Sequence, residues 1–150
     1  MSLAAGIELV RDNKGPEAQA VLAGLATHRR AAMAARPEAL EAHPLCLLRR
    51  DAAGAVCAGL VGEVAMDWLF IDKFWVDESL RGQGTGTALL AAAEAEARRL
   101  GAVGAHLYTS SFQAPAFYRK HGFREIGRLE GRPQGHYRLW FAKRFGAPAG

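Results

Sequence analysis

The sequence predicts an α/β (α+β) fold in which helices flank a mixed, largely antiparallel central sheet. Segments that favour strands and segments with helical spacing follow one another along the 150-residue chain. A turn at Ala53-Gly54 lies between two adjacent strand-like segments and predicts a β-hairpin. The length suits a single domain, residues 1–150, with a real core, and only residues 146–150 are expected to form a loose tail.

The N-terminal part of the chain predicts a strand followed by helices. Residues 6–10 favour a strand, and Pro16 favours the first turn of a helix that extends to about Ala35. Pro37 favours the start of a second, shorter helix. Three apolar residues of the first helix are expected to face inward: Val21, Leu22 and Leu25.

The rest of the chain predicts most of the sheet and two further helices. The expected strands are 45–50, 55–66, 69–76, 105–109, 123–129 and 136–143. The expected helices are 84–100 and 114–121. The longer one carries apolar residues at helical spacing: Leu89, Ala93, Ala97 and Leu100. Glu94 and Arg98 are placed to pair on its outer side, and Gly101 is expected to end it.

The two cysteines, Cys46 and Cys57, lie on either side of the hairpin turn. If Arg50 pairs with Ala55, Cys57 faces Leu48 rather than Cys46. We therefore expect both cysteines to be small core residues rather than a disulfide.

A glycine-rich turn joins the strand that ends near Val76 to the helix that follows. Gly82, Gly84 and Gly86 stand at alternate positions, which lets backbone N–H groups converge without side chains in the way. The helix adds its free N-terminal donors and the positive end of its dipole. This arrangement predicts a site for a ligand that carries phosphate.

Two common nucleotide motifs fit this turn poorly. A P-loop has Lys followed by Ser or Thr after its last glycine, whereas Thr87 and Ala88 follow Gly86 here. The dinucleotide fingerprint ends in Gly or Ala, and neither register of the turn supplies one there. No acidic residue follows at the spacing needed to bind a ribose, because residues 101–105 are Gly, Ala and Val.

The turn instead resembles the acyl-CoA loop of the GNAT N-acetyltransferase superfamily, with the pattern Arg81-x-x-Gly84-x-Gly86. Residues 109–123 resemble the second GNAT signature, a short helix with Phe-Tyr that ends in Gly-Phe before a strand. The two motifs have the family's order and separation. The resemblance covers about residues 69–145, and the N-terminal region matches only in pattern.

Two further segments are similar to a set of small bacterial GNAT proteins. They are Phe-Gln-Ala-Pro at 112–115 and Pro-Gln-Gly-His at 133–136. The second is expected to be a loop between the last two strands, a position that often borders the acceptor pocket in the family.

The resemblance implies an acetyl-CoA-dependent N-acetyltransferase that transfers the acetyl group directly to a primary amine. The end of the strand before the turn would bind the pantetheine arm through its backbone, the turn would hold the pyrophosphate, and Gln113 would contact the arm where many members have Asn. The cofactor-binding residues carried over are Phe74, Trp75, Val76, Arg81, Gly82, Gln83, Gly84, Thr85, Gly86, Thr87 and Gln113.

The resemblance also places Tyr118 near the thioester sulfur, where its phenol would give a proton to the departing CoA. A phenol with an ordinary pKa of about 10 is protonated at neutral pH and suits this role. The general base stays open: in members with a carboxylate base on this strand, the matching residue here is Phe70. The candidates are Asp72, Glu63, His106 and His136, of which Asp72 is expected to share a face with Phe70 and Phe74. No His/Cys cluster has the spacing of a metal site.

Composition and charge define the expected partners. The net charge of +4 and pI of about 9.4 come from scattered arginines, which disfavours a nucleic-acid partner. No apolar run approaches the ~18 residues of a membrane span, and no secretory signal is visible, so we expect a cytoplasmic protein without a membrane partner. A small-molecule amine is the favoured acceptor. A peptide or protein amine, a non-catalytic acyl-CoA-binding sensor module and a homodimer stay open.

Overall fold

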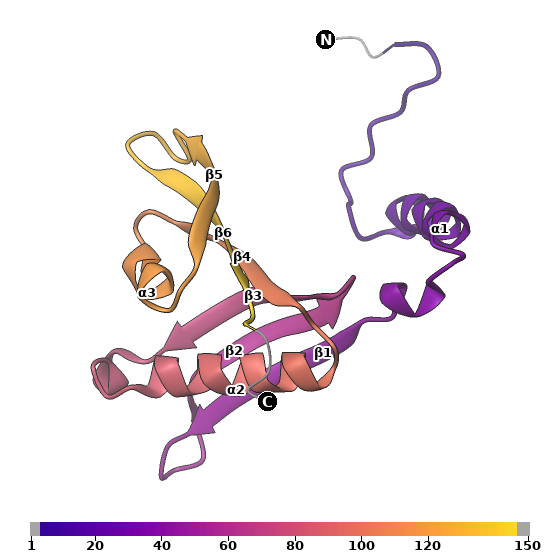
Figure 1. Cartoon of the computed structure of the whole chain (residues 1–150). Helices are drawn as coiled ribbons and strands as arrows, with labels where there is room; N and C mark the ends of the chain where they lie inside the picture. Colours follow the sequence, from indigo (N-terminus) through magenta and orange to yellow (C-terminus); the bar gives the residue numbers. More distant parts are fainter. Residues whose placement is uncertain (1–3, 147–150) are drawn as a thin grey trace. The chain divides into compact units, whose positions relative to one another are not determined.

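The computed structural model describes residues 4–146, which fall into two compact units, 4–40 and 41–146 (Figure 1). The single domain expected from the length stays a prediction. None of the helices among the described residues is long and apolar enough to cross a membrane.

The first unit contains helix α1 (Pro16–Ala32) and the 3-10 helix η1 (Pro37–Leu40), which confirms both predicted helices. The strand predicted at residues 6–10 is wrong. That segment forms no strand, and its local order is a turn in which the Ile7 N–H donates to the Ala4 carbonyl at 3.0 Å. A strand needs a partner to satisfy its backbone groups, and the sheet pairs none of its strands with this segment.

The apolar side of α1 is not covered within its own unit. No residue of α1 is buried, and Val21, Leu22 and Leu25, which the sequence predicted to face inward, are exposed. A helix can bury an apolar stripe only against a second layer. The first unit provides no such layer, so the prediction is wrong for this unit.

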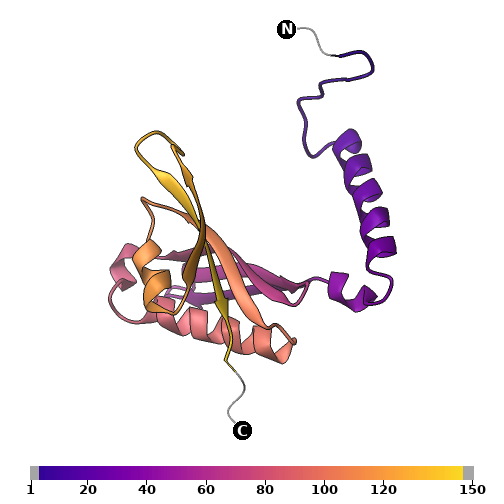
Figure 2. The same cartoon turned by 45° about the horizontal axis from the view of Figure 1, so that its top comes forward.

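The second unit is a six-stranded sheet with helices (Figure 2). The strands are β1 (His43–Arg50), β2 (Val56–Ala65), β3 (Trp68–Val76), β4 (Gly104–Ser110), β5 (Arg124–Glu130) and β6 (Tyr137–Arg144). The helices are η2 (Glu78–Leu80), α2 (Thr85–Arg99) and α3 (Pro115–Lys120). The strand order is β1-β2-β3-β4-β6-β5, and only β3 and β4 run parallel. This confirms the predicted mixed, largely antiparallel sheet with flanking helices.

Strands β3 and β4 diverge soon after they meet. They pair only where 68–70 lies beside 104–106. Beyond this point β3 continues against β2 alone and β4 continues against β6 alone. Figure 2 shows the two halves of the sheet spreading apart. Among residues 4–146, the C-terminal half of β3 therefore has one edge without a strand partner, and we refer to this opening as the splay.

Helix α2 packs on the sheet through the stripe that the sequence predicted. Leu89, Ala93 and Ala97 are buried, and Leu100 packs against the core from a half-buried position. Gly101, with φ of 88°, follows the end of the helix as expected. The core also includes residues of the strands and of α3: Leu60, Leu69, Ile71, Leu107, Tyr118, Leu139 and Phe141.

The charged residues on α2 do not pair as predicted. Glu94 accepts hydrogen bonds from the Lys143 ammonium at 2.9 and 3.2 Å. Arg98 lies over the Phe145 ring, 4.6 Å from its centroid, and donates to the Gly146 carbonyl at 2.9 Å. Partners brought near by the tertiary fold replace the local i,i+4 partner. The rest of the expected loose tail, 147–150, lies outside the described residues.

The β1–β2 hairpin corrects the prediction for the cysteines. Arg50 pairs with Val56, and a bulge at this point leaves Cys57 without a Cα partner. The Cys57 thiol donates to the Arg49 carbonyl at 3.4 Å. Both cysteines are free, as expected, but Cys46 is exposed and Cys57 is half-buried, so neither is a core residue.

Candidate active site

The glycine turn contains glycines that serve two different purposes. Gly82 and Gly84 have φ of 78° and 77°, a region that side chains rarely adopt, and a Cβ on either would meet open space. Gly86 lies inside the first turn of α2, where a Cβ would lie 3.4 Å from the Phe117 ring. The first two therefore shape the turn, and the third lets α2 approach α3.

The N-terminus of α2 is open to a ligand. Gly84 is the N-cap residue, and no side chain of the described part of the chain caps the helix. The first backbone N–H groups of a helix have no partner within the helix. Together with the positive end of the helix dipole, they favour an anion at this end.

Two threonines of the turn bind other parts of the protein. The buried Thr85 hydroxyl accepts a hydrogen bond from the Arg49 guanidinium at 2.9 Å, which ties β1 to the start of α2. The Thr87 hydroxyl lies 3.1 Å from Nε2 of His121 at the end of α3. The sequence did not indicate Arg49 or His121, because both contacts join residues more than 30 positions apart in the chain.

The predicted pantetheine-binding strand end lies at the splay. Phe74, Trp75 and Val76 pair with β2 on one side, while their other edge has no strand partner. The Phe74 side chain packs into the core, and Trp75 is 50% exposed. The free edge leaves main-chain donors and acceptors for an extended ligand, as the resemblance implies.

Asp72 is the extra residue of a β-bulge. Val61 pairs with Lys73 and Gly62 pairs with Ile71, so Asp72 has no partner on β2. The bulge also changes which side chains share a face. Phe70 contacts His106 and Tyr108, whereas Phe74 packs against the core. The prediction that Asp72 shares a face with both phenylalanines is therefore wrong, since they lie on opposite faces.

The Asp72 carboxylate has a cation as its immediate neighbour. It is exposed and forms an ion pair with the Lys73 ammonium at 2.9 Å. This hydrogen bond raises the pKa of Lys73, and Tyr108 and Arg138 also act on that pKa, in opposite directions. Asp72 therefore lies just beyond the point where β3 and β4 part, with the Lys73 ammonium as its partner.

Tyr118 lies beneath the splay, among aromatic rings from several elements. Its ring centroid is 6.4 Å from Phe74 on β3, 5.9 Å from Phe141 on β6 and 5.8 Å from Phe123. Burial raises the pKa of its phenol to about 12. The phenol is therefore protonated across the physiological range and can serve as a proton donor.

Gln113 is engaged locally. Its side-chain oxygen accepts hydrogen bonds from the Thr109 hydroxyl and the Ser110 N–H, both at 2.9 Å. This contact shapes the turn between β4 and α3. Of the Gln113 amide, the nitrogen is the group left to donate to a ligand.

The other base candidates lie in two places: where β3 and β4 still pair, and beside the end of β4. Glu63 pairs across β2 and β3 with Phe70, and His106 pairs with Phe70 from β4, so both lie where the strands still pair. Desolvation beside the Trp68 and Phe70 rings lowers the pKa of His106. His136 lies at the other end, beside the end of β4.

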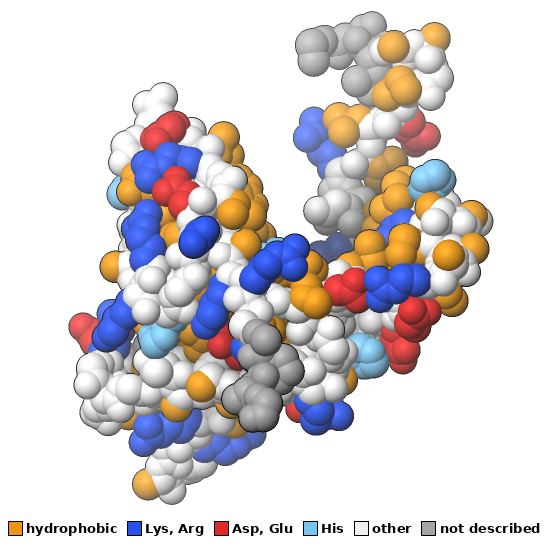
Figure 3. All heavy atoms as spheres, in the orientation of Figure 1, with side chains coloured by type: hydrophobic (Ala, Val, Ile, Leu, Met, Phe, Trp, Pro, Cys, Tyr) orange, Lys and Arg blue, Asp and Glu red, His pale blue; other side chains and the backbone are white. Residues whose placement is uncertain are grey.

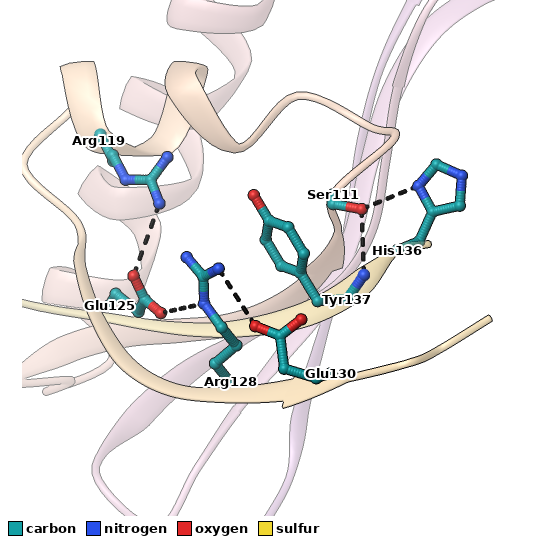
Figure 4. Close-up of polar contacts among 7 residues, drawn as sticks. All are labelled: Ser111, Arg119, Glu125, Arg128, Glu130, His136 and Tyr137. Atoms are coloured by element: carbon teal, nitrogen blue, oxygen red, sulfur yellow. Dashed lines mark hydrogen bonds and ion pairs between the residues drawn. The ribbon is translucent and has the colours of Figure 1, made fainter. Parts of the chain in front are cut away.

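His136 is held by Ser111 (Figure 4). The Ser111 hydroxyl lies 3.1 Å from Nδ1 of His136 and accepts a hydrogen bond from the Tyr137 N–H at 3.2 Å. The Phe112 ring meets the imidazole edge-on, with centroids 5.2 Å apart. These contacts fix the orientation of the ring, so the remaining nitrogen, Nε2, is the one available to an acceptor substrate.

An ion-pair chain joins α3 to β5 in the same region (Figure 4). Glu125 lies 3.6 Å from Arg119 and 3.0 Å from Arg128, and Arg128 lies 3.4 Å from Glu130. Arg128 also stacks on the Tyr137 ring, 4.0 Å from its centroid. The hydrogen bond from Arg128 lowers the pKa of Glu125. The chain ties the region around His136 to the helix that carries Tyr118.

A cavity of about 440 Å³ lies beside the glycine turn, between the β1–β2 hairpin and η2. Its lining includes Arg49, Arg50 and Ser79. On the face shown in Figure 3, Lys and Arg side chains are spread over the second unit rather than gathered in one block.

Comparison with known proteins gives consistent matches. Residues 42–125 match the acetyltransferase (GNAT) domain family. A blasticidin-S acetyltransferase from Streptomyces morookaense is 38% identical over 130 residues, which are 86% of this chain and 88% of that protein. An acetyltransferase from Agrobacterium fabrum is 41% identical over 96 residues, or 64% of this chain and 70% of that protein. The crystal structure of an acetyltransferase from Bacillus cereus matches with a TM-score of 0.82 and 31% identity, covering 92% of this chain and 98% of that chain.

Proposed function

This chain belongs to the GNAT acetyltransferase family, and we propose that it transfers the acetyl group of acetyl-CoA directly to a primary amine of a small molecule. The observation that carries the proposal is the splay. The open glycine turn follows β3, one of the diverging strands, and the Tyr118 ring contacts Phe74 on β3 and Phe141 on β6. A long phosphate-bearing thioester fits a site that combines an anion-binding helix end with a free strand edge.

In the proposed complex, the backbone N–H groups at 82–87 bind the pyrophosphate, with Arg81 adding positive charge. The free edge of Phe74, Trp75 and Val76 binds the pantetheine arm, as a peptide would bind to an open strand. This places the thioester in the splay, near Tyr118. Thr85 contributes its backbone N–H, because its hydroxyl is buried and held by the guanidinium of Arg49.

The proposed reaction is a direct acyl transfer. The acceptor nitrogen attacks the thioester carbonyl carbon, the C–S bond breaks, and the departing sulfur takes the phenolic proton of Tyr118. The raised pKa of Tyr118 keeps this proton in place until the thiolate forms. The amine loses its own proton to a base, for which we propose Asp72 at the bulge, with His136 as the second candidate.

A small-molecule acceptor is supported by the similarity to the blasticidin-S acetyltransferase, which covers most of both chains. Blasticidin S is therefore the first acceptor to test. A peptide amine and a non-catalytic acyl-CoA-binding module are the competing functions.

The test is calorimetric titration with acetyl-CoA, with ATP and NAD as controls, followed by a thiol-release assay with a panel of amines. We expect selective binding of acetyl-CoA and thiol release with at least one small amine. Binding without release on any amine or peptide would favour the sensor module, and no acetyl-CoA binding would overturn the proposal.

A further inference from the structure

Aromatic side chains gather on the face of the sheet that turns away from α2. On β4, Ala105 and Leu107 are buried in the core, so His106 and Tyr108 point to the opposite face. On β6, Leu139 and Phe141 are buried in the same way. Two side chains that alternate with them share the face with Tyr108: Arg138 and Trp140.

Arg138 lies over two rings of this aromatic group. Its guanidinium carbon is 4.1 Å from the Tyr108 ring centroid and 5.7 Å from that of Trp140. The Tyr108 ring is itself 6.5 Å from Trp140 and 5.9 Å from Phe70. We call Tyr108, Trp140 and Arg138 the platform. Stacking on the rings orients the guanidinium and removes water from its faces.

The platform carries a cation without a matching anion. Within residues 4–146, Arg138 forms no ion pair, and its Nε is buried without a hydrogen-bond partner. An arginine held in this way has outer N–H groups that suit a carboxylate, which can accept two parallel hydrogen bonds. A ligand with a cationic group at this position would instead be repelled by the positive charge of Arg138.

The platform lies beside the proposed chemistry. Arg138 on β6 pairs with Ser110, the last residue of β4. This part of β4 has already separated from β3. The Tyr108 ring under Arg138 is 5.9 Å from the ring of Phe70 on β3, two residues before Asp72. A ligand that reaches from Arg138 toward Asp72 would therefore cross the mouth of the splay.

We propose that the platform selects acceptor amines that carry a carboxylate, which Arg138 binds while the amine lies toward Asp72. This inference rests on the proposed acetyl transfer and names its substrate class. Arg138 is then a specificity-determining residue, and the acceptor is a small amino acid-like molecule.

The test uses matched acceptors, each amino acid paired with its carboxamide, with saturating acetyl-CoA. We expect the wild type to favour the carboxylate form in kcat/KM. Arg138→Met should reduce kcat/KM for the carboxylate about 10- to 100-fold, because a charge-assisted hydrogen bond is lost, and leave the carboxamide almost unchanged. Arg138→Lys should recover part of the preference.

Arg144→Met is the matched control. Arg144 also stacks on a ring of this face, 5.3 Å from the Trp68 centroid, but at the end where β3 and β4 pair. It should keep the wild-type preference, and acetyl-CoA affinity should be the same in all variants. Equal kcat/KM for the two acceptor forms in the wild type, or equal losses for both in Arg138→Met, would overturn the proposal.

The two proposals can fail separately. If no amine releases thiol, the proposed function fails, and the platform is judged by calorimetric binding of the amino acids to the protein with CoA. Binding to the wild type that Arg138→Met abolishes supports the platform. No binding, or the same binding to both proteins, overturns it.

Discussion

The Phe74 and Tyr118 rings meet edge to face, with centroids 6.4 Å apart and planes at 70°. Phe74 lies on β3, and Tyr118 lies on α3 and also contacts Phe141 on β6. The Tyr118 ring thus joins the two halves of the sheet below the point where they part. The residue proposed to donate the proton is therefore positioned by both walls of the proposed cofactor site.

Tyr118→Phe should lower kcat by roughly 10²- to 10⁴-fold, the usual contribution of a general acid. Acetyl-CoA affinity should stay within about twofold, because the ring and its contacts remain. Steady-state kinetics and calorimetry measure the two effects. Tyr137→Phe is the control, since that phenol is outside the proposed reaction. Unchanged kcat in Tyr118→Phe would remove the phenol from the mechanism.

Stability at high pH should report the buried phenol. The pKa of Tyr118 is about 12 in the folded protein and about 10 when unfolded, so the unfolded chain loses this proton first. The contribution of the neutral phenol to the free energy of unfolding is complete below pH 10. It is lost as the pH rises toward 12, for a total of about 3 kcal/mol. Urea unfolding of wild type and Tyr118→Phe across this range should show the loss only in the wild type. Parallel curves would mean that the phenol is not desolvated.

Gly84→Val should weaken acetyl-CoA binding by tenfold or more, because its side chain would enter the space in front of the helix N-terminus. It also introduces strain of roughly 1–2 kcal/mol at a left-handed backbone position. Gly101→Val is the matched control: it has φ of 88°, open space around its Cβ, and lies at the other end of α2. We expect thermal unfolding to show similar destabilisation of the two variants, and calorimetry to show weaker acetyl-CoA binding only in Gly84→Val. A binding defect of equal size in both would point to folding instead.

Arg49→Met should destabilise the protein by about 1–3 kcal/mol, because the buried Thr85 hydroxyl loses its donor. Arg50→Met serves as the comparison, since within residues 4–146 the Arg50 side chain donates only to the Gly54 carbonyl of an exposed turn. Urea unfolding measures both. Equal effects would show that the link between β1 and α2 contributes nothing of its own.

The pH–rate profiles of Asp72→Asn and His136→Ala should identify the base. The variant whose profile loses its acidic limb has lost the group that takes the amine proton. Ser111→Ala should lower kcat without removing that limb if His136 is the base, because Ser111 orients the imidazole. If both single variants keep the wild-type limb, a water molecule takes the proton.

Several features followed from local patterns in the sequence. The glycine turn, the buried stripe of α2 and the α3 segment with Tyr118 were predicted because backbone conformation and helical spacing depend on neighbouring residues. Residues 6–10 show the limit of this reasoning. They have a strand-like composition, yet no partner strand pairs with them.

The tertiary structure decided how these parts act together. The bulge at Asp72 separates Phe70 from Phe74, the Arg49–Thr85 bond secures the turn, and the platform places Arg138 on Tyr108. Each depends on strand register or on contacts between residues far apart in the chain. Local sequence determined where the turn, helices and most strands begin and end. Long-range pairing decided the splay and the neighbours of each side chain, because those contacts exist only once the whole sheet has formed.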